Sequence, residues 1–265
     1  MNKRYLALLL TVLMLCAVFC GCKKVEYNPD SNSNNKSTSY QNADINVRRM
    51  ADNIDTWIID ISLYKSNPAT IFNYCITDLD QNGRLEMLTT VNYSDVTEIK
   101  CYEVNEDLTG LTFVENVTDS QSHADINTYD GTCYKDSATG RIYYIYTDER
   151  TEKDENTGAV NKYSSKVALS LFEGKLYQET LATKAVIRTE GQTEAELVYT
   201  DNQGNTITEE DYNNIVESRF SSMEKKTAVL AWKGCTVANH DKNINLASND
   251  LIILLSDSFE RFAVK

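Results

Sequence analysis

The chain has 265 residues, of which 39 are acidic and 26 are basic, so its formal net charge at pH 7 is −13. Such a negative surface repels nucleic acid and anionic lipid headgroups, which argues against both as partners. The same acidity is compatible with the binding of divalent cations. A chain of this length fits either one large domain or two small ones.

The first 21 residues have the features of an export signal. Lys3 and Arg4 are followed by an apolar run from Leu6 to Phe19, which is shorter than the roughly 20 residues that a transmembrane helix needs. We therefore predict a signal peptide over residues 1–21, with Cys22 as the first residue of the mature chain. An uncleaved anchor and an ordinary cleaved signal are the alternatives, and either would also export the domain.

The junction Gly21-Cys22 resembles the lipobox of bacterial lipoproteins, although Phe19 and Cys20 stand where that motif usually has leucine and a small residue. The resemblance implies that Cys22 is diacylated and anchors the chain to the cell membrane, facing outside the cytoplasm. Two acyl chains on one residue suffice for stable anchoring, whereas a single chain is marginal.

Residues 22–42 contain the lipidated cysteine and a polar stretch that is almost free of apolar side chains. Such a stretch cannot bury enough apolar surface to offset its ordering entropy, so we expect a disordered tether. At about 5–6 Å times the square root of its residue number, the tether would hold the domain roughly 25 Å from its anchor. The folded domain is predicted to occupy residues 43–265. Loss of Lys3 and Arg4 with the signal would change the net charge from −13 to −15.

The first element of the domain is predicted to be a helix from Asp44 to Lys65, ended by Pro68. Apolar residues recur there at three- and four-residue spacing, which is typical of an amphipathic helix that covers a sheet. These residues are Val47, Met50, Ile54, Trp57, Ile58 and Ile61.

Strand patterns then dominate the chain up to about residue 200, and most of the sixteen tyrosines lie in this region. Short turn signals such as Asp136–Gly140 and Glu173-Gly174 separate the runs, which indicates an antiparallel meander rather than βαβ crossovers. The predicted strands are 72–77, 85–88, 98–104, 111–116, 132–135, 141–147, 162–172, 175–188 and 195–200. A tyrosine-rich sheet face is compatible with glycan binding, but tyrosine is also an ordinary strand residue.

Two helices are predicted after the strands. Thr208 is a favourable N-cap, and the acidic residues Glu209, Glu210 and Asp211 suit the first turn that follows it. A last helix begins at Ser248 and carries an apolar stripe. The stripe consists of Leu251, Ile252, Leu255, Phe259 and Phe262. The predicted fold class is therefore α+β, an antiparallel β-sheet meander with an N-terminal helix and two C-terminal helices.

The segment Asp78–Glu86 is the strongest candidate for a functional site. Oxygen-bearing side chains stand at its positions one, three and five, a glycine at six permits a sharp turn, and a backbone carbonyl at seven adds an oxygen. Hard cations such as calcium prefer several oxygen ligands that converge in this way. The predicted calcium ligands are Asp78, Asp80, Asn82, the carbonyl of Arg84, and Glu86.

This segment resembles the first half of an EF-hand loop, although Thr89 stands at position twelve, where a bidentate glutamate is expected. With its flanking strands, Tyr74 to Leu88 is more similar to the strand–DxDxDGxxE–strand calcium loop of exported Firmicute lipoproteins. Similar loops occur in FG-GAP-type propeller blades and, more distantly, in dockerins, but both need further copies and this chain has one. The junction Thr200–Tyr212 is also similar to those lipoproteins. The resemblance implies a metal site and an extracytoplasmic location, in a family that mostly lacks an assigned activity.

A plain β-hairpin is the alternative interpretation of the acidic loop, because Asn-Gly at 82–83 is a strong signal for a type I′ turn. Against it, the three carboxylates of the loop would repel one another without a cation, since only Arg84 lies nearby as a counter-charge.

The predicted mature chain has four cysteines besides Cys22, namely Cys75, Cys101, Cys133 and Cys235. An even number in an exported protein permits two disulfides with three pairings, and Cys75 and Cys101 lie on strands that are candidates for neighbours. Buried free thiols that act as small apolar side chains are the alternative.

No residue pattern identifies a reaction. His123 and His240 lack zinc spacing with any cysteine, and there is no P-loop, dinucleotide fingerprint or HExxH motif. We therefore expect a lipid-anchored binding or structural module with one calcium ion and an unidentified glycan or protein ligand. One alternative is a cell-wall or glycan-directed hydrolase, which needs two carboxylates in a cleft. The other is a transport-associated substrate-binding lipoprotein, which needs α/β lobes.

Overall fold

The computed structural model describes residues 35–57, 71–93, 96–118, 122–124, 130–153, 158–188, 194–236 and 248–265. The predicted signal peptide and the lipidation site Cys22 lie outside these residues. The chain divides into two units, Met1–Thr38 and Ser39–Lys265. Of the first unit, only the beginning of one helix is described, and all the strands belong to the second.

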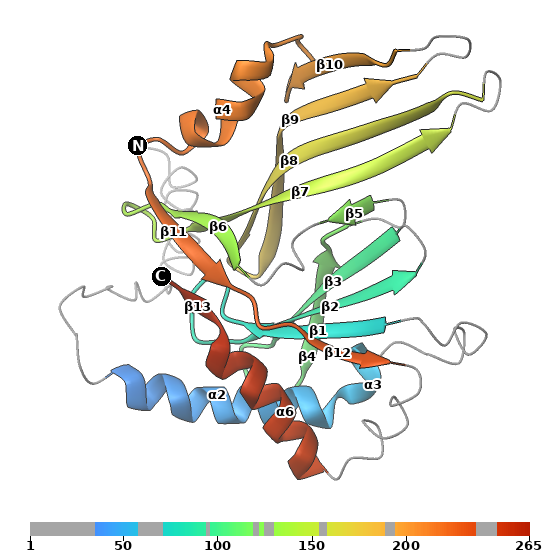
Figure 1. The fold of residues 1–265 in the computed structure, drawn as a ribbon. Helices are drawn as coiled ribbons and strands as arrows, with labels where there is room; N and C mark the ends of the chain where they lie inside the picture. Colours follow the sequence, from blue (N-terminus) through green and yellow to red (C-terminus); the bar gives the residue numbers. More distant parts are fainter. Residues whose placement is uncertain are drawn as a thin grey trace, which may run out of the picture. The chain divides into compact units, whose positions relative to one another are not determined.

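Five strands form the first sheet, in the order β12-β1-β2-β3-β4. They are β1 (Ile71–Thr77), β2 (Glu86–Tyr93), β3 (Val96–Val104), β4 (Leu111–Asn116) and β12 (Lys233–Thr236). The first four follow one another along the chain and pair antiparallel, whereas β12 returns from much later in the sequence to pair with β1 (Figure 1).

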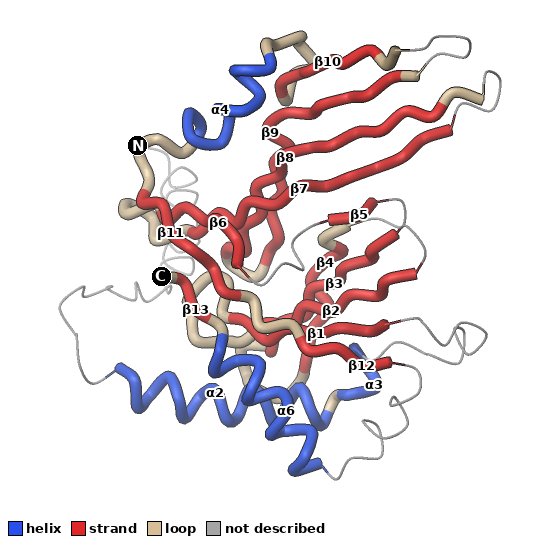
Figure 2. Tube along the Cα trace, viewed as in Figure 1, coloured by secondary structure: helices blue, strands red, loops and turns tan. Residues whose placement is uncertain are grey.

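The second sheet has the order β10-β9-β8-β7-β6-β11-β13, and β5 pairs with β7 off this path (Figure 2). Its strands are β5 (Ser122–Ala124), β6 (Asp130–Lys135), β7 (Ile142–Lys153), β8 (Val160–Phe172), β9 (Lys175–Ile187), β10 (Glu196–Asp201), β11 (Glu224–Val229) and β13 (Ala263–Val264). Every strand pairing in the described part of the chain is antiparallel. The α/β lobes expected of a transport-associated binding protein would instead need parallel strands.

The described helices are α2 (Asn35–Asp52), α3 (Ile54–Trp57), α4 (Glu209–Arg219) and α6 (Ser248–Arg261). α6 packs on β1, and α4 packs on β9 and β10. The predicted N-cap of α4 is confirmed: the Asp211 backbone N–H donates to the Thr208 hydroxyl at 3.0 Å, and the Thr208 N–H donates to the Asp211 carboxylate at 3.3 Å. Among the residues that the structure describes, no helix is both long and apolar enough to cross a membrane.

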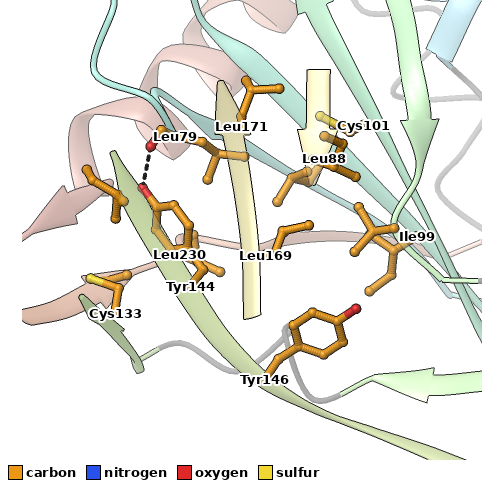
Figure 3. Packing of buried hydrophobic residues seen from close by; sticks show 14 of the residues in the cluster. Leu79, Leu88, Ile99, Cys101, Cys133, Tyr144, Tyr146, Leu169, Leu171 and Leu230 are labelled. Carbon is orange, nitrogen blue, oxygen red and sulfur yellow. Dashed lines mark hydrogen bonds between the residues drawn. The ribbon is translucent and has the colours of Figure 1, made fainter. Parts of the chain in front are cut away.

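Both faces of the first sheet are buried, because alternate residues of its strands enter two different hydrophobic clusters. The helix cluster lies where α2 and α6 meet one face, and includes Val47, Met50, Tyr74, Ile76, Leu85, Met87, Tyr102, Leu251 and Leu255. The inter-sheet cluster joins the other face to the second sheet (Figure 3), and includes Cys75, Leu79, Leu88, Ile99, Cys101, Tyr144, Leu169 and Leu171.

The α+β class and the antiparallel strands are confirmed, but the prediction of one meander is wrong, because the strands divide between two sheets. β5, β11, β12 and β13 were not predicted, since they are short or lack a clear alternating pattern. The first helix begins at Asn35 rather than Asp44, so the last eight residues of the predicted tether are helical. Those residues carry no apolar stripe from which periodicity could have placed them. The end predicted at Lys65 lies outside the described residues.

The cysteines Cys75, Cys101 and Cys133 are free and buried. Leu88 of β2 pairs with both Cys75 and Cys101, so those two residues are two strand spacings apart, or roughly 9–10 Å, which is beyond the reach of a disulfide. Burial raises the pKa of Cys75 to about 12 and that of Cys133 to about 11. For these three residues the buried-thiol alternative holds, and the side chain of Cys235 lies outside the described residues.

The docking of α6 can be tested with two substitutions in that one helix. Leu255 is fully buried in the helix cluster, whereas the side chain of Ile253 is 64% exposed. We expect Leu255→Ala to lower the free energy of unfolding by about 2–5 kcal/mol, and Ile253→Ala to change it by only about 0.5 kcal/mol. Urea denaturation measures both. Equal effects of the two substitutions would show that α6 is not docked as described.

Candidate metal centre

The acidic loop connects β1 to β2 and contains eight residues, because Thr77 and Glu86 form the last antiparallel pair before it. Two of its residues have left-handed backbone conformations, Gln81 with φ of 57° and Gly83 with φ of 83°. A type I′ turn would require positive φ at Asn82 as well as at Gly83. The type I′ turn considered from the sequence is therefore wrong, although β1 and β2 do form an antiparallel hairpin, with a wider loop between them.

Three carboxylates of this loop converge. One oxygen atom from each of Asp78, Asp80 and Glu86 lies within 4.8 Å of the other two, so the group is able to hold a metal ion. Asp78 and Asp80 are half-buried, and Glu86 is completely buried. Residues that are separated along the sequence thus form one compact cluster of carboxylates.

The Glu86 carboxylate is satisfied on one side only. Its Oε2 accepts the Leu79 backbone N–H at 2.6 Å and the Thr77 hydroxyl at 3.3 Å. Its Oε1 is buried and has no hydrogen-bond partner among the described residues. Because a buried polar atom without a partner costs about 1–3 kcal/mol, and more when it is charged, such an atom calls for an explanation. A cation held between the three carboxylates supplies one.

Burial makes these acids hard to ionise without a cation. It raises the pKa of Glu86 well above its ordinary value, and the charges of Asp78 and Asp80 raise it further. Burial also raises the pKa of Asp78 to about 6, with the neighbouring Asp80 charge adding to the effect. Burial is also the main cause that raises the pKa of Asp80. A positive ion at this point would reverse these shifts.

The other two predicted ligands are placed differently. The Asn82 amide oxygen accepts the Arg84 backbone N–H at 2.6 Å, and its Nδ2 donates to Asp80 at 2.8 Å. Asn82 therefore meets the carboxylates with its nitrogen rather than with an oxygen ligand. The Arg84 guanidinium lies 2.7 Å from Glu103, so Arg84 contributes a counter-charge beside the site.

Glu103 is a further acidic residue that the loop motif did not reveal. It lies on β3, directly opposite Glu86 in the register, and it is buried. Burial raises its pKa, while the Arg84 charge lowers it. Tyr93 pairs with Val96 where β2 and β3 meet, and counting back along both strands from that pair places Glu103 opposite Glu86. No local sequence motif, however, marks Glu103 as part of a site.

Side chains from three other elements hold the loop in place. Asn46 of α2 accepts the Leu85 N–H at 3.2 Å and donates to the Gly83 carbonyl at 3.4 Å. The Tyr144 hydroxyl of β7 donates to the Leu79 carbonyl at 2.8 Å (Figure 3). Lys135 of β6 donates to the Gln81 side chain at 2.7 Å. The loop is thus tied to a helix and to the second sheet.

Comparison with known proteins gives no further assignment: no family model, no curated protein and no solved structure matches the chain.

The raised pKa values of the carboxyl groups in the metal-free loop predict an unusual pH dependence of the free energy of unfolding. A carboxyl group whose pKa is raised by folding destabilises the folded state once the pH exceeds its unfolded value, about 4.3 for glutamate, and the loss grows until the raised pKa is passed. In EDTA at pH 7, Glu86→Gln should therefore be more stable than the wild type, by about 1–3 kcal/mol. Near pH 4 the two should be nearly equal.

Urea denaturation in EDTA at both pH values measures this difference. Glu115→Gln is the matched control, because Glu115 is exposed on β4 and its substitution should change stability little at either pH. A Glu86→Gln protein that is less stable than the wild type in EDTA at pH 7 would contradict the description of Glu86 as a buried, uncompensated charge.

Proposed function

We propose that this chain is a membrane-anchored lipoprotein outside the cytoplasm, and that its domain is a binding or structural module stabilised by one calcium ion in the loop Asp78–Glu86. The observation that carries the metal site is the fully buried Glu86, whose Oε1 lacks a partner beside two further carboxylates. Three carboxylates so close together in a buried place resist ionisation at neutral pH, and a positive counter-ion would allow all three to be charged.

Calcium suits this donor set better than magnesium or zinc. The converging groups are carboxylate oxygens, which hard cations prefer, and no histidine or thiol is among them. Magnesium demands a near-ideal octahedron at about 2.0–2.1 Å, whereas calcium accepts 6–8 oxygens in irregular geometry. Asp78, Asp80 and Glu86 would supply the protein carboxylates. The Arg84 carbonyl, the Asn82 amide oxygen after a change of partner, and water would supply the remaining ligands.

The position of the loop supports a structural rather than a catalytic role for the ion. Leu79 at one end of the loop is buried in the inter-sheet cluster, and Leu85 at the other end is buried in the helix cluster. The Oε2 atom of Glu86 bonds to the backbone of Leu79 itself. An ion that fixes Glu86 therefore fixes the residue that enters the core between the sheets.

The proposed location rests on the sequence. The apolar leader and the lipobox-like Gly21-Cys22 support export and lipidation, and a calcium site suits the outside of the cell, where extracellular modules bind calcium at about 10⁻⁴–10⁻³ M. The buried thiols are compatible with this location, because their raised pKa values keep them protonated and unreactive at neutral pH.

Calcium should raise the thermal stability of the protein. A ligand that binds only the folded state adds about 2.7 kcal/mol at a concentration 100-fold above its dissociation constant. We expect the melting temperature in millimolar calcium to exceed that in EDTA, with a smaller rise in magnesium. Asp80→Asn and Glu86→Gln should both abolish the rise, while Glu115→Gln should retain it. Identical melting of the wild type in calcium and in EDTA would rule out the metal site.

Lipidation has its own test. Cells that express the full chain are labelled with an alkyne analogue of palmitate, and we expect the label to be incorporated into the wild type and lost in Cys22→Ser. Cys20→Ser, which changes a nearby thiol in the leader, should keep the label. Incorporation that persists in Cys22→Ser would place the anchor elsewhere, and absence of label in the wild type would remove the anchor from the proposal.

A further inference from the structure

A second feature, independent of the metal centre, lies on the face of the second sheet that α4 covers in part. Residues of β7, β8 and β9 alternate between the inter-sheet cluster and this opposite face. Ser170 pairs with Tyr177 in the register of β8 and β9, and Tyr143 precedes Tyr144, which pairs with Leu169 of β8. Tyr143, Ser170 and Tyr177 all line the same part of this face. A hollow of about 270 Å³ opens on this face, between these residues and the last turn of α4.

Small residues form the base of the hollow. Ala168 and Ser170 of β8 line it and are almost completely buried, at 2% and 1% exposure. The larger Tyr143 and Tyr177 stand on the neighbouring strands, and Tyr177 is 42% exposed. A recess therefore forms where a strand with short side chains lies between two strands with aromatic ones. Its volume is slightly below the usual range for drug-sized ligands and suits a single ring.

Arg141, the residue before β7, is held in place by a hydroxyl group and aromatic rings rather than by a carboxylate. Its Nε donates to the Ser170 hydroxyl at 2.8 Å. Its guanidinium carbon lies 4.3 Å from the centre of the Tyr177 ring and 5.2 Å from that of Tyr143. Among the described residues, no acidic group forms an ion pair with Arg141, although the chain contains 39 acidic residues. Within the described part of the chain, the one hydrogen bond of this guanidinium is that of Nε, so its terminal nitrogens are free to donate to a ligand.

The opposite end of the hollow is electrically neutral. Arg219 of α4 binds Glu179 through two contacts, Nε to Oε1 at 3.3 Å and Nη2 to Oε2 at 3.1 Å. Glu179 is the acidic residue that lines the hollow, and its charge is balanced by this pair. The hollow thus presents one net positive charge, from Arg141, next to an exposed aromatic ring.

We propose that this hollow binds a carboxylate-bearing sugar, such as a uronic acid, at a glycan end or free. The planar guanidinium fork matches a carboxylate through two parallel hydrogen bonds, and the C–H face of a pyranose ring packs on the exposed Tyr177 ring. One unpaired guanidinium balances a monoanion but not a phosphate dianion, whose remaining charge would face a protein of net charge −13. At physiological salt, exposed charges more than about 8 Å apart are largely screened from one another, which limits the repulsion between a bound monoanion and the acidic groups of the protein.

The test uses the full chain in mild detergent with EDTA, so that calcium cannot bridge a carboxylate to the protein. Saturation-transfer NMR titrations compare glucuronate with glucose, acetate and inorganic phosphate. We expect glucuronate to bind in the millimolar range, and each of the other three to bind about tenfold more weakly or not at all. No binding of glucuronate up to tens of millimolar would overturn the proposal. Equal binding of glucose would also overturn it and indicate a neutral-glycan surface, and equal binding of acetate or phosphate would indicate an anion site that does not recognise a sugar.

Substitutions assign the binding to the hollow. Arg141→Gln should weaken glucuronate binding on the order of tenfold or more. Tyr177→Ala removes the ring but keeps the Arg141 charge and its bond to Ser170, and it should weaken binding as well. Arg150→Gln is the matched control, because Arg150 also lies over a tyrosine, 5.4 Å from the Tyr163 ring, but it pairs with Glu152 at 3.0 Å. Unchanged binding in Arg141→Gln, in a protein that melts as the wild type does, would place the sugar elsewhere and overturn the proposal. If Arg141→Gln fails to fold, Tyr177→Ala decides in the same way.

Discussion

The hydrogen bond from the Leu79 backbone to the buried Glu86 carboxylate is the interaction on which the arrangement of both cores depends. It joins the beginning of the loop to Glu86, the first residue of β2. On one side of it Leu79 enters the core between the sheets, and on the other Leu85 enters the core beneath α2 and α6. Because successive residues of a strand point to opposite faces, a first sheet that is buried on both faces needs its connecting loop to serve both cores. Tyr144 of β7 adds one hydrogen bond to the loop, and Asn46 of α2 adds two.

Closing the loop with a buried carboxylate has an electrostatic cost. A neutral side chain at position 86 would close the loop with less desolvation, yet the chain places there a glutamate beside two aspartates and opposite Glu103. Arg84 forms an ion pair with Glu103 at 2.7 Å and acts on Asp80 through its charge, but within the described part of the chain none of the three carboxylates forms an ion pair. Burial that raises the pKa of each of these acids is unfavourable for a protein at neutral pH, unless an ion restores the balance. The same residues thus connect the stability of the domain to the supply of that ion.

Local patterns in the sequence were sufficient for the elements whose signals are local. The predicted strand 111–116 and the N-cap at Thr208 placed β4 and α4 correctly, and the loop motif identified the three converging carboxylates. Sheet membership was not predictable in this way, because β12 pairs with β1 across more than 150 residues of sequence and β11 lies between β6 and β13. The motif also misled at Asn82, whose amide oxygen is engaged by the Arg84 backbone. Glu103, Asn46 and Tyr144 reach the site only through tertiary pairing, so no local pattern contains them.

The two candidate sites lie in different parts of the second unit, and each suits a different role. The acidic loop lies between the cores, where a bound ion affects stability, and its carboxylates face one another rather than a ligand in solution. The hollow lined by Arg141 lies on the other face of the second sheet, away from the inter-sheet cluster, and its aromatic ring and guanidinium are accessible. β7 and β8 contribute residues to the inter-sheet core and to the hollow, since Tyr144 and Leu169 belong to the core while Tyr143 and Ser170 line the hollow. An ion that fixes the Leu79 contact with Tyr144 would therefore also steady the strands that carry the hollow. If the proposed binding function holds, this connection is a physical reason for such a module to contain the proposed ion.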